Sequence, residues 1–232
     1  MQNILITGIS SGIGEALAAF YLRRGDCVFG VSRTESQILQ NFDNFRFESC
    51  DLSDFNAIAI TLKKLCSTIT NIDLVVLNAG MLGEIKPIIQ TDLKELQMVM
   101  NLNVWSNKVI LDNISYSHSV KQVVAISSGA AINGSFGWGG YSLSKATLNM
   151  LIKLYSREMK NTHISALAPG LILTPMLDYI LDDVDDDIYH SIKRLKESKK
   201  FTPDEIAPIL NDTFSKLLKM ESGIFTDVRS ME

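Results

Sequence analysis

The stretch that decides the fold lies at the start of the chain and reads Gln2-Asn3-Ile4-Leu5-Ile6-Thr7-Gly8-Ile9-Ser10-Ser11-Gly12-Ile13-Gly14. Its apolar first half is typical of a buried parallel strand, and the residues from Ile13 onward have helical spacing. A strand, a glycine turn and a helix in this order place backbone N–H groups and a helix dipole where a pyrophosphate can bind. The spacing is G-x3-G-x-G rather than G-x-G-x-x-G, and glycines at a helix start could also form only a tight connection.

A second motif reads Tyr141-Ser142-Leu143-Ser144-Lys145 and begins thirteen residues after Ser128. Residues four apart share one face of a helix, so the phenol of Tyr141 and the ammonium of Lys145 should project together. We expect the ammonium to favour the phenolate and to lower the pKa of Tyr141, which makes the phenol a usable acid or base near neutral pH. The same pair also occurs on ordinary surface helices, so the motif is weak when taken alone.

The position of Ser128 supports a functional interpretation of that motif. The run Val123-Val124-Ala125-Ile126 predicts a buried strand, and the strand ends in Ser127-Ser128-Gly129. Open α/β sheets bind ligands in the crevice outside the carboxyl ends of their strands. Ser128 is therefore placed to hydrogen-bond a substrate oxygen.

Taken together and in order, these segments resemble the short-chain dehydrogenase/reductase family, in its compact single-domain branch. The resemblance extends over nearly the whole chain, and each of its motifs is weak singly while the ordered set is specific. The family often has Asn-Asn-Ala-Gly where this chain has Leu77-Asn78-Ala79-Gly80, but the Asn that matters in the family is retained. The other matching segments are Thr7-Gly8 to Gly14, Cys50-Asp51-Leu52, an Asn in the following long helix, Ser128, Tyr141, Lys145, and Pro169-Gly170-Leu171-Ile172-Leu173-Thr174.

The resemblance implies a role for each residue of a catalytic site. Tyr141 is the general acid in reduction and the base in the reverse direction. Lys145 tunes Tyr141 and hydrogen-bonds the nicotinamide ribose, and Ser128 polarises and orients the substrate oxygen. An Asn completes a proton relay through a bound water, and the sequence offers both Asn101 and Asn103; the apolar frame favours Asn103. The hydride itself belongs to the cofactor.

The resemblance also implies the cofactor contacts. The glycine turn (Gly8, Ser10, Ser11, Gly12, Ile13, Gly14) holds the phosphates, and Asp51 with Leu52 lies beside the adenine. Asn78, Ala79 and Gly80 form the segment that supports the central strand and runs past the ribose of the cofactor. Pro169, Gly170, Ile172 and Thr174 form the loop that holds the nicotinamide amide.

The residues after the second predicted strand favour NADP(H) over NAD(H). A chain specific for NAD would carry an acidic residue near Ser32 to accept the ribose 2′-OH, and none is present. Arg33 instead offers a fork for a 2′-phosphate, with Ser32 and Thr34 as further donors. If Arg33 only stacks on the adenine or lies in solvent, NAD(H) could serve.

Composition excludes several other classes of protein. The chain has 232 residues, 46% of them apolar and 21% charged, which is typical of an ordinary globular domain. A net charge of −4 and the lack of a basic, aromatic-rich cluster argue against nucleic acid, and no apolar run is long enough for a membrane span. The start of the chain has no signal-type segment, so we expect a cytoplasmic protein. Cys27, Cys50 and Cys66 are expected to be small core residues.

No metal site is expected. The three histidines are scattered, and the acidic stretch Asp182–Asp187 lacks the Gly and the bidentate Glu of a calcium loop, with Ile188 where the Gly is required. We expect this stretch to be solvated.

Strand-like runs near 3–7, 27–32, 45–49, 73–77, 121–127, 163–168 and 223–226 alternate with amphipathic helical runs. This alternation predicts an α/β fold, a single-domain, Rossmann-like doubly wound parallel sheet of about seven strands over residues 1–232. Thr202-Pro203-Asp204-Glu205 has the form of a capping box and predicts a last long helix that ends near Met220.

The sequence says least about the substrate. By resemblance, residues 175–200 form a flap over a small carbonyl or alcohol substrate, with an apolar side that could exclude water. Phe136 and Trp138 are further candidates for the pocket, with Glu84, Lys86 and Asn133 as polar ones. The alternatives are a dinucleotide-binding sensor or scaffold with little turnover, or epimerase- or dehydratase-type chemistry, which the short length disfavours.

The resemblance also implies a homodimer or homotetramer. Six apolar residues on two helices could form its face or could face only the sheet: Val109, Ile110, Leu148, Leu151, Ile152 and Leu154.

Overall fold

The computed structural model describes residues 1–231, and in it seven strands form one parallel sheet. The strand order is β3-β2-β1-β4-β5-β6-β7, so the order reverses between β1 and β4. This confirms the predicted α/β, doubly wound parallel sheet, and every strand lies within two residues of its predicted bounds. The strands are β1 (Asn3–Thr7), β2 (Cys27–Ser32), β3 (Phe45–Ser49), β4 (Asn71–Leu77), β5 (Ser119–Ile126), β6 (His163–Ala168) and β7 (Phe225–Asp227).

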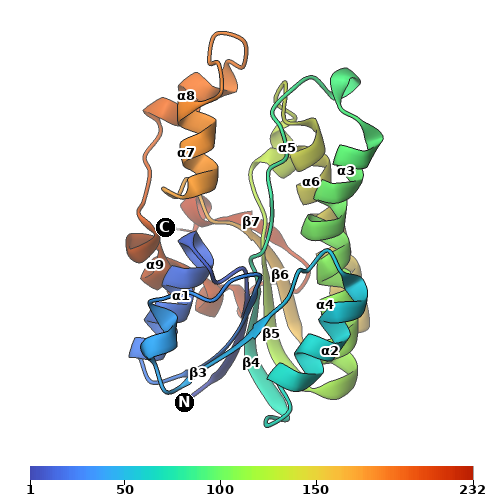
Figure 1. The fold of residues 1–232 in the computed structure, drawn as a ribbon, viewed down its shortest axis with the longest axis vertical. Helices are drawn as coiled ribbons and strands as arrows, with labels where there is room; N and C mark the ends of the chain where they lie inside the picture. The colour runs from blue at the N-terminus through green and yellow to red at the C-terminus, as the bar shows by residue number, and fades with distance from the viewer. Residues whose placement is uncertain (232) are drawn as a thin grey trace.

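Helices cover both faces of the sheet (Figure 1). On one face lie α1 (Gly12–Arg23) and α9 (Pro203–Leu217), and on the other lie α2 (Phe55–Leu65), α4 (Ser106–Ser117) and α6 (Gly139–Glu158). Successive residues of a strand point to opposite faces, so Ile4 and Ile6 pack in one core while Leu5 packs in the other. This burial on both faces explains why the strands read as continuous apolar runs.

The remaining helices gather beyond the carboxyl ends of the strands (Figure 1). They are α3 (Leu93–Met100), α5 (Ala130–Asn133), α7 (Pro175–Asp182) and α8 (Ser191–Glu197). Between α3 and α4 the chain forms a π-helical turn at Asn101–Trp105. Such turns are rare and often lie at functional sites.

The predicted capping box is present at the start of α9. Thr202 Oγ1 accepts a hydrogen bond from the Glu205 N–H at 3.2 Å, and Glu205 Oε2 accepts one from the Thr202 N–H at 2.8 Å. The helix ends at Leu217, short of the predicted Met220, because the following N–H groups of Lys219 and Met220 bond three residues back instead of four.

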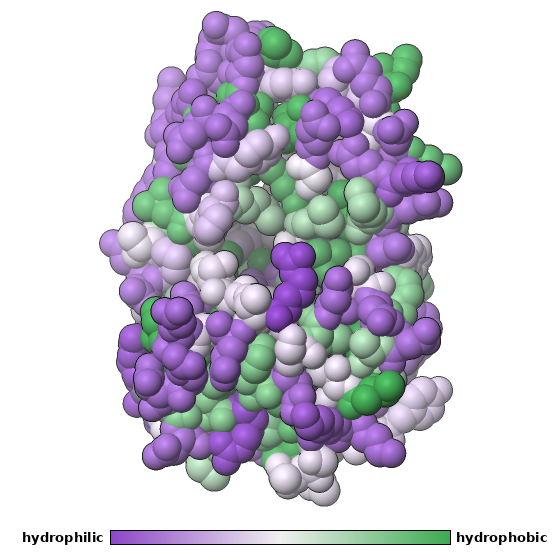
Figure 2. Space-filling view, in the orientation of Figure 1, coloured by the Kyte–Doolittle hydropathy of each residue, from purple (hydrophilic) through white to green (hydrophobic). Residues whose placement is uncertain are grey.

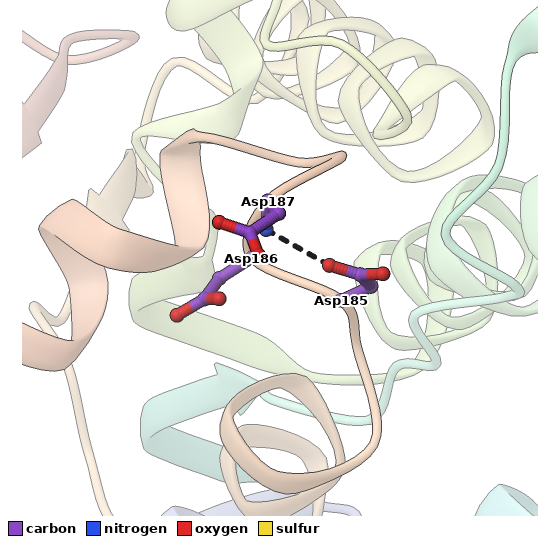
Figure 3. A group of neighbouring side chains, drawn as sticks. All are labelled: Asp185, Asp186 and Asp187. Atoms are coloured by element: carbon purple, nitrogen blue, oxygen red, sulfur yellow. Dashed lines mark hydrogen bonds between the residues drawn. The ribbon is translucent and has the colours of Figure 1, made fainter.

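The acidic stretch lies in the turn between α7 and α8 (Figure 3). The carboxylates of Asp185, Asp186 and Asp187 come close enough together to resemble a metal site. Asp185 accepts a hydrogen bond from the Asp187 N–H at 2.9 Å, while Lys193 pairs with Asp187 at 2.6 Å and Lys196 with Asp186 at 2.9 Å. These two lysines pair with two of the five aspartates in the stretch Asp182–Asp187.

The structure decides between the two interpretations of the expected oligomer face for three of its six residues. Ile110, Leu148 and Ile152 are at most 1% exposed and lie in the core between helices and sheet, so they face the sheet. Val109 and Leu151 are partly buried against that same core, and Leu154 is exposed.

Two further expectations concern membrane spans and cysteines. Within residues 1–231, no helix has both the length and the apolar character that crossing a bilayer requires. Cys50 and Cys66 are buried as predicted, whereas Cys27, at the start of β2, is only half-buried. None of the three forms a disulfide.

Candidate active site

A cavity of about 960 Å³ lies at the carboxyl edge of the sheet. Its walls include residues that directly follow β1, β2, β3, β4, β5 and β6, and the end of β7. Figure 2 shows the molecule hollowed at this level, with apolar surface near the hollow and hydrophilic surface on the rim. The cavity lies over the β1–β4 reversal, the position at which doubly wound sheets bind ligands.

Most of the predicted cofactor residues line this cavity. They are Gly8, Ser10, Ser11, Gly12, Ile13, Ser32, Arg33, Asp51, Leu52, Asn78, Ala79, Gly80, Tyr141, Lys145, Pro169, Gly170, Ile172 and Thr174. Three predicted site residues, Gly14, Thr34 and Asn103, do not line it. Each of these three has a contact that explains its position.

The glycine turn is held too close to neighbouring backbone for any side chain. Gly8 has a φ of +72°, and a Cβ on it would lie 2.9 Å from Ala79 Cα. A Cβ on Gly14 would lie 2.1 Å from Gly8 O, so this glycine allows α1 to begin directly against the turn. Gly14 therefore acts in packing and does not line the wall, although it was expected among the cofactor contacts.

Asn78 fixes the turn from the neighbouring strand. Its Nδ2 donates to Thr7 O at 3.0 Å and to Gly8 O at 2.9 Å, and its backbone N–H donates to Thr7 Oγ1 at 3.0 Å. The Ala79 N–H donates to the same hydroxyl at 3.1 Å. The start of the glycine turn is thus tied to the end of β4 by four hydrogen bonds.

Ser128, Tyr141 and Lys145 share one wall of the cavity. Ser128 follows β5, and its Oγ accepts a hydrogen bond from the Ala130 N–H at 3.1 Å. Tyr141 and Lys145 lie on the first turns of α6, as the i,i+4 spacing predicts, with Lys145 Nζ 5.6 Å from the centre of the phenol ring. Lys145 is 4% exposed, and its Nζ donates to Ile126 O at 2.8 Å.

Burial dominates the titration of both groups. It raises the pKa of Tyr141 to about 12, and a hydrogen bond with the Ser128 side chain acts in the opposite direction. It lowers the pKa of Lys145 to about 8. The expectation that Lys145 lowers the pKa of Tyr141 is therefore wrong for this structure, because the loss of solvent at the phenol is the larger effect.

Asn103 lies in the π-helical turn and is fully buried. Its Oδ1 accepts from the Met81 N–H at 2.8 Å, and its Nδ2 donates to Met81 O at 2.8 Å and to Ser144 Oγ at 2.9 Å. The Ser144 hydroxyl donates in turn to Tyr141 O at 2.8 Å. The Asn103 amide thus connects the loop after β4 to the first turn of α6.

Two further observations define the surroundings of Asn103. A Cβ on Gly80 would lie 3.2 Å from Asn103 Oδ1 and 3.5 Å from Lys145 Nζ, so both groups border the same glycine. Asn101, the alternative candidate, lines the cavity. The Asn103 carbonyl accepts a hydrogen bond from Asn107 Nδ2 at 2.9 Å, while the buried Oδ1 of Asn107 has no partner among residues 1–231.

The far end of the cavity is formed by the residues after β2 and β3. Arg33 is exposed and lines the wall together with Asp51, whose carboxylate accepts hydrogen bonds from Ser53. These bonds lower the pKa of Asp51, and the positive charge of Arg33 adds to the effect. Ser32 Oγ donates to Thr34 O at 2.7 Å, which holds the turn while the Thr34 side chain remains outside the wall.

The near end of the cavity is apolar. Of the expected pocket residues, Trp138, Met176, Leu177, Ile180 and Asn133 line it. Phe136 does not; it is 61% exposed and stacks on Tyr189 with 5.6 Å between ring centres. Glu84 and Lys86 pair with each other at 2.8 Å and also lie off the wall.

Sequence reasoning missed several residues of this site. Ser144 and Asn107 have no motif of their own, although their spacing from Tyr141 and Asn103 by three and four residues was a usable signal. Arg194, on α8, and Asp227 with Arg229, after β7, line the cavity. Only the tertiary fold brings these last three residues to the site.

The strand order, the glycine turn at the reversal and the cavity above it define a doubly wound dinucleotide-binding fold. Comparisons with known proteins give the family. Residues 2–185 match the sequence profile described as short chain dehydrogenase. The chain belongs to the short-chain dehydrogenase/reductase family, whose members are oxidoreductases that bind a nicotinamide dinucleotide.

Individual relatives agree with this assignment. The chain is 30% identical to a benzil reductase ((S)-benzoin forming) of Bacillus cereus, over 91% of this chain and 93% of the relative. It is similar in fold to a short-chain dehydrogenase/reductase of Saccharomyces cerevisiae, with a TM-score of 0.84, 22% identity and coverage of 98% and 96%. A structure of ElxO with NADP bound gives a TM-score of 0.80 at 22% identity, with coverage of 98% and 97%.

Proposed function

We propose that the chain is an NADP(H)-dependent reductase of small carbonyl compounds, reversible as a dehydrogenase. The observation that carries this proposal is the common wall of Ser128, Tyr141 and Lys145 in the cavity that also contains the glycine turn. A proton donor and a dinucleotide cradle open into the same space. Intact acid–base machinery favours an enzyme over a sensor that only binds the cofactor.

The residues present fit an NADP(H) molecule. The turn from Gly8 to Gly12 and the start of α1 offer backbone N–H groups without side chains in the way, as a diphosphate requires. Arg33 would hold a 2′-phosphate at the far end, where no acidic side chain from residues 32–36 lines the wall. When bound, the nicotinamide supplies the hydride.

The proton chemistry belongs to residues of this chain. Tyr141 donates its phenolic proton to the carbonyl oxygen, and with a pKa of about 12 it remains in the acid form at neutral pH. Ser128 hydrogen-bonds the same oxygen and orients it. The Lys145 ammonium has three N–H donors and uses one of them on Ile126 O. The other two can donate to a ribose hydroxyl and to the developing phenolate.

Asn103 is proposed as a positioning residue. All its amide atoms are engaged by Met81 and Ser144, so it holds the loop after β4 against the start of α6. The free Oδ1 of Asn107, next to the Asn103 carbonyl, is suited to hold a buried water of the relay.

The near wall favours an apolar or aromatic carbonyl compound. Trp138 lies 6.2 Å from Tyr141 between ring centres, and Leu177 and Ile180 line the wall from α7. The relative from Bacillus cereus is named for the reduction of benzil, an aromatic diketone.

We propose one domain over 1–232, with residues 175–200 closing over the substrate, and a homo-oligomeric assembly.

The test is the oxidation of NADPH and of NADH, followed by absorbance, against ketones, aldehydes, diketones and quinones. Turnover with NADPH on any of these classes, faster than with NADH, is the expected result. Cofactor binding without turnover on the whole panel would favour the sensor instead.

A further inference from the structure

The cavity has a second face that the proposed chemistry does not use, and α8 provides it. Ser191, Arg194, Leu195 and Ser198 all line the cavity. Ser191, Arg194 and Leu195 are three and four residues apart, which places them on one side of α8, and Ser198 directly follows the helix. The helix therefore presents a guanidinium, one hydroxyl and one apolar side chain to the substrate compartment, and Ser198 adds a second hydroxyl.

Hydrogen bonding and stacking fix this helix next to Tyr141. The indole Nε1 of Trp138 donates to Ser191 Oγ at 3.0 Å, and the Trp138 ring lies 6.2 Å from that of Tyr141. Just before α8, Tyr189 stacks on Phe136. Arg194 is three residues after Ser191, about 5–6 Å away between Cβ atoms. It therefore belongs to the Tyr141 end of the cavity, whereas Arg33 belongs to the opposite end.

The charges around Arg194 leave its guanidinium without a partner. Within residues 1–231 its side chain makes no hydrogen bond or ion pair. On the wall of the cavity, Asp227 pairs with Arg229 at 2.6 Å, and the two lysines beside Arg194 on α8 pair with the acidic turn, Lys193 with Asp187 and Lys196 with Asp186. Arg194 is exposed, and it brings to this end of the cavity a guanidinium that is unpaired among the described residues.

We propose that Arg194 binds an acidic group of the substrate, so that the preferred substrates are keto acids with an apolar or aromatic body. A guanidinium fork matches a carboxylate through two parallel hydrogen bonds, and Leu195 and Leu177, which line the same cavity, can contact the apolar body of such a substrate. The same bond would orient the ketone toward Tyr141. This inference rests on the proposed reductase activity and adds the substrate class.

The cofactor diphosphate is the competing anion, and the structure favours the substrate. The glycine turn and the start of α1 supply the diphosphate site with its own donors, while the contacts of Ser191 and Trp138 place α8 beside Tyr141. A role on the diphosphate would show as weaker NADPH binding.

The experiment compares keto acids with their methyl esters, which lack the negative charge and carry one additional methyl group. The pairs are 2-oxo-2-phenylacetate, 3-oxo-3-phenylpropanoate and 4-oxo-4-phenylbutanoate with their esters, at saturating NADPH; the additional methyl group of the ester is the same for every protein variant compared. Arg194→Gln should lower kcat/KM for the best acid about tenfold and change its ester less than twofold, since a charge-assisted hydrogen bond is lost. Arg194→Lys should keep part of the preference. Lys193→Gln removes the same charge from the adjacent residue off the wall and should change neither substrate.

Several outcomes would overturn the inference. These are a wild-type protein that prefers no acid to its ester, an equal loss on acid and ester in Arg194→Gln, or a weaker NADPH affinity in that variant by fluorescence titration. Ester turnover tests the reductase activity separately from the acid preference. If nothing is turned over, calorimetry on the NADP+-loaded protein decides: the acid must bind more tightly than its ester, and Arg194→Gln must abolish the difference.

Discussion

Tyr141→Phe is the most direct test of the acid–base assignment, because it removes one oxygen atom and keeps the ring. The ring packs with the apolar cluster of Leu177 and Trp138, and phenylalanine preserves those contacts. The loss is the phenolic proton and the hydrogen bond with Ser128. A positioned general acid contributes about 10²- to 10⁴-fold to rate, which corresponds to about 3 to 5 kcal/mol of barrier.

The assay is NADPH oxidation with a saturating diketone such as benzil. We expect kcat to fall by about 10²- to 10⁴-fold, while the Kd for NADPH changes less than about threefold, because no charge is lost. The free energy of unfolding should fall by only about 1 kcal/mol, the usual value of one hydrogen bond. Ser128 would still polarise the carbonyl, so some turnover should remain.

Tyr155→Phe is the matched control. Tyr155 lies on the same helix, and its hydroxyl hydrogen-bonds Asp112 and Lys108 O outside the cavity. This variant should lose a similar amount of stability and keep its full kcat. If Tyr141→Phe turned over at the wild-type rate, or if both variants lost activity equally, Tyr141 would not be the proton donor.

Three further predictions use other parts of the site. Burial lowers the pKa of Lys145 in the folded protein from its ordinary value of 10.5 to about 8. Between pH 8 and pH 10.5, Lys145 is therefore protonated in the unfolded chain and largely deprotonated in the folded protein. The contribution of Lys145 to the free energy of unfolding therefore rises with pH across that window, by at most about 1.4 kcal/mol per pH unit. In Lys145→Met, the free energy of unfolding measured in urea should depend less on pH there. An unchanged pH dependence would contradict the shift of the Lys145 pKa. Arg33→Asp should weaken NADPH binding about tenfold and favour NADH, and an unchanged ratio of the two Kd values would show that the 2′-phosphate site lies elsewhere. Gly14→Ala places a Cβ 2.1 Å from Gly8 O, so it should lower the free energy of unfolding by at least about 2 kcal/mol and weaken NADPH binding. Thermal unfolding with and without NADPH measures both effects. Wild-type behaviour would mean that α1 can move away from the turn at no cost.

The strands and the glycine turn could be predicted because their signals are local. A strand buried on both faces must be apolar throughout, as Ile4-Leu5-Ile6 is, and a turn that meets backbone at Gly8 and Gly14 admits only glycine. Ser128 and Asn78 could be assigned because they follow such strands, whose carboxyl ends meet at one edge. The order of the segments then adds the specificity that each lacks alone.

What could not be predicted depends on contacts between distant segments. The sign of the Tyr141 pKa shift follows from burial, and no spacing between Tyr141 and Lys145 reports how much solvent the fold removes. Likewise, three of the six apolar residues considered for an oligomer face, Ile110, Leu148 and Ile152, are buried where helices α4 and α6 cover the sheet. Arg194 is distant in sequence from every motif, and tertiary contacts such as the Trp138–Ser191 hydrogen bond and the packing of Ile192 with Trp138 and Leu177 bring it to the site.

Burial of Tyr141 and Lys145 links the chemistry of the site to its ligands. In the protein alone, removal from solvent disfavours the charged form of both groups, with pKa values of about 12 and about 8. In the proposed reaction, proton transfer from Tyr141 would create a phenolate, and a protonated Lys145 would stabilise it across the 5.6 Å that separates Nζ from the ring centre. A nearby anion raises the pKa of Lys145 and so favours the charged form that this step requires. A site with this arrangement should be a poor acid when empty and a competent one when it holds a negatively charged dinucleotide, which couples proton donation to cofactor binding.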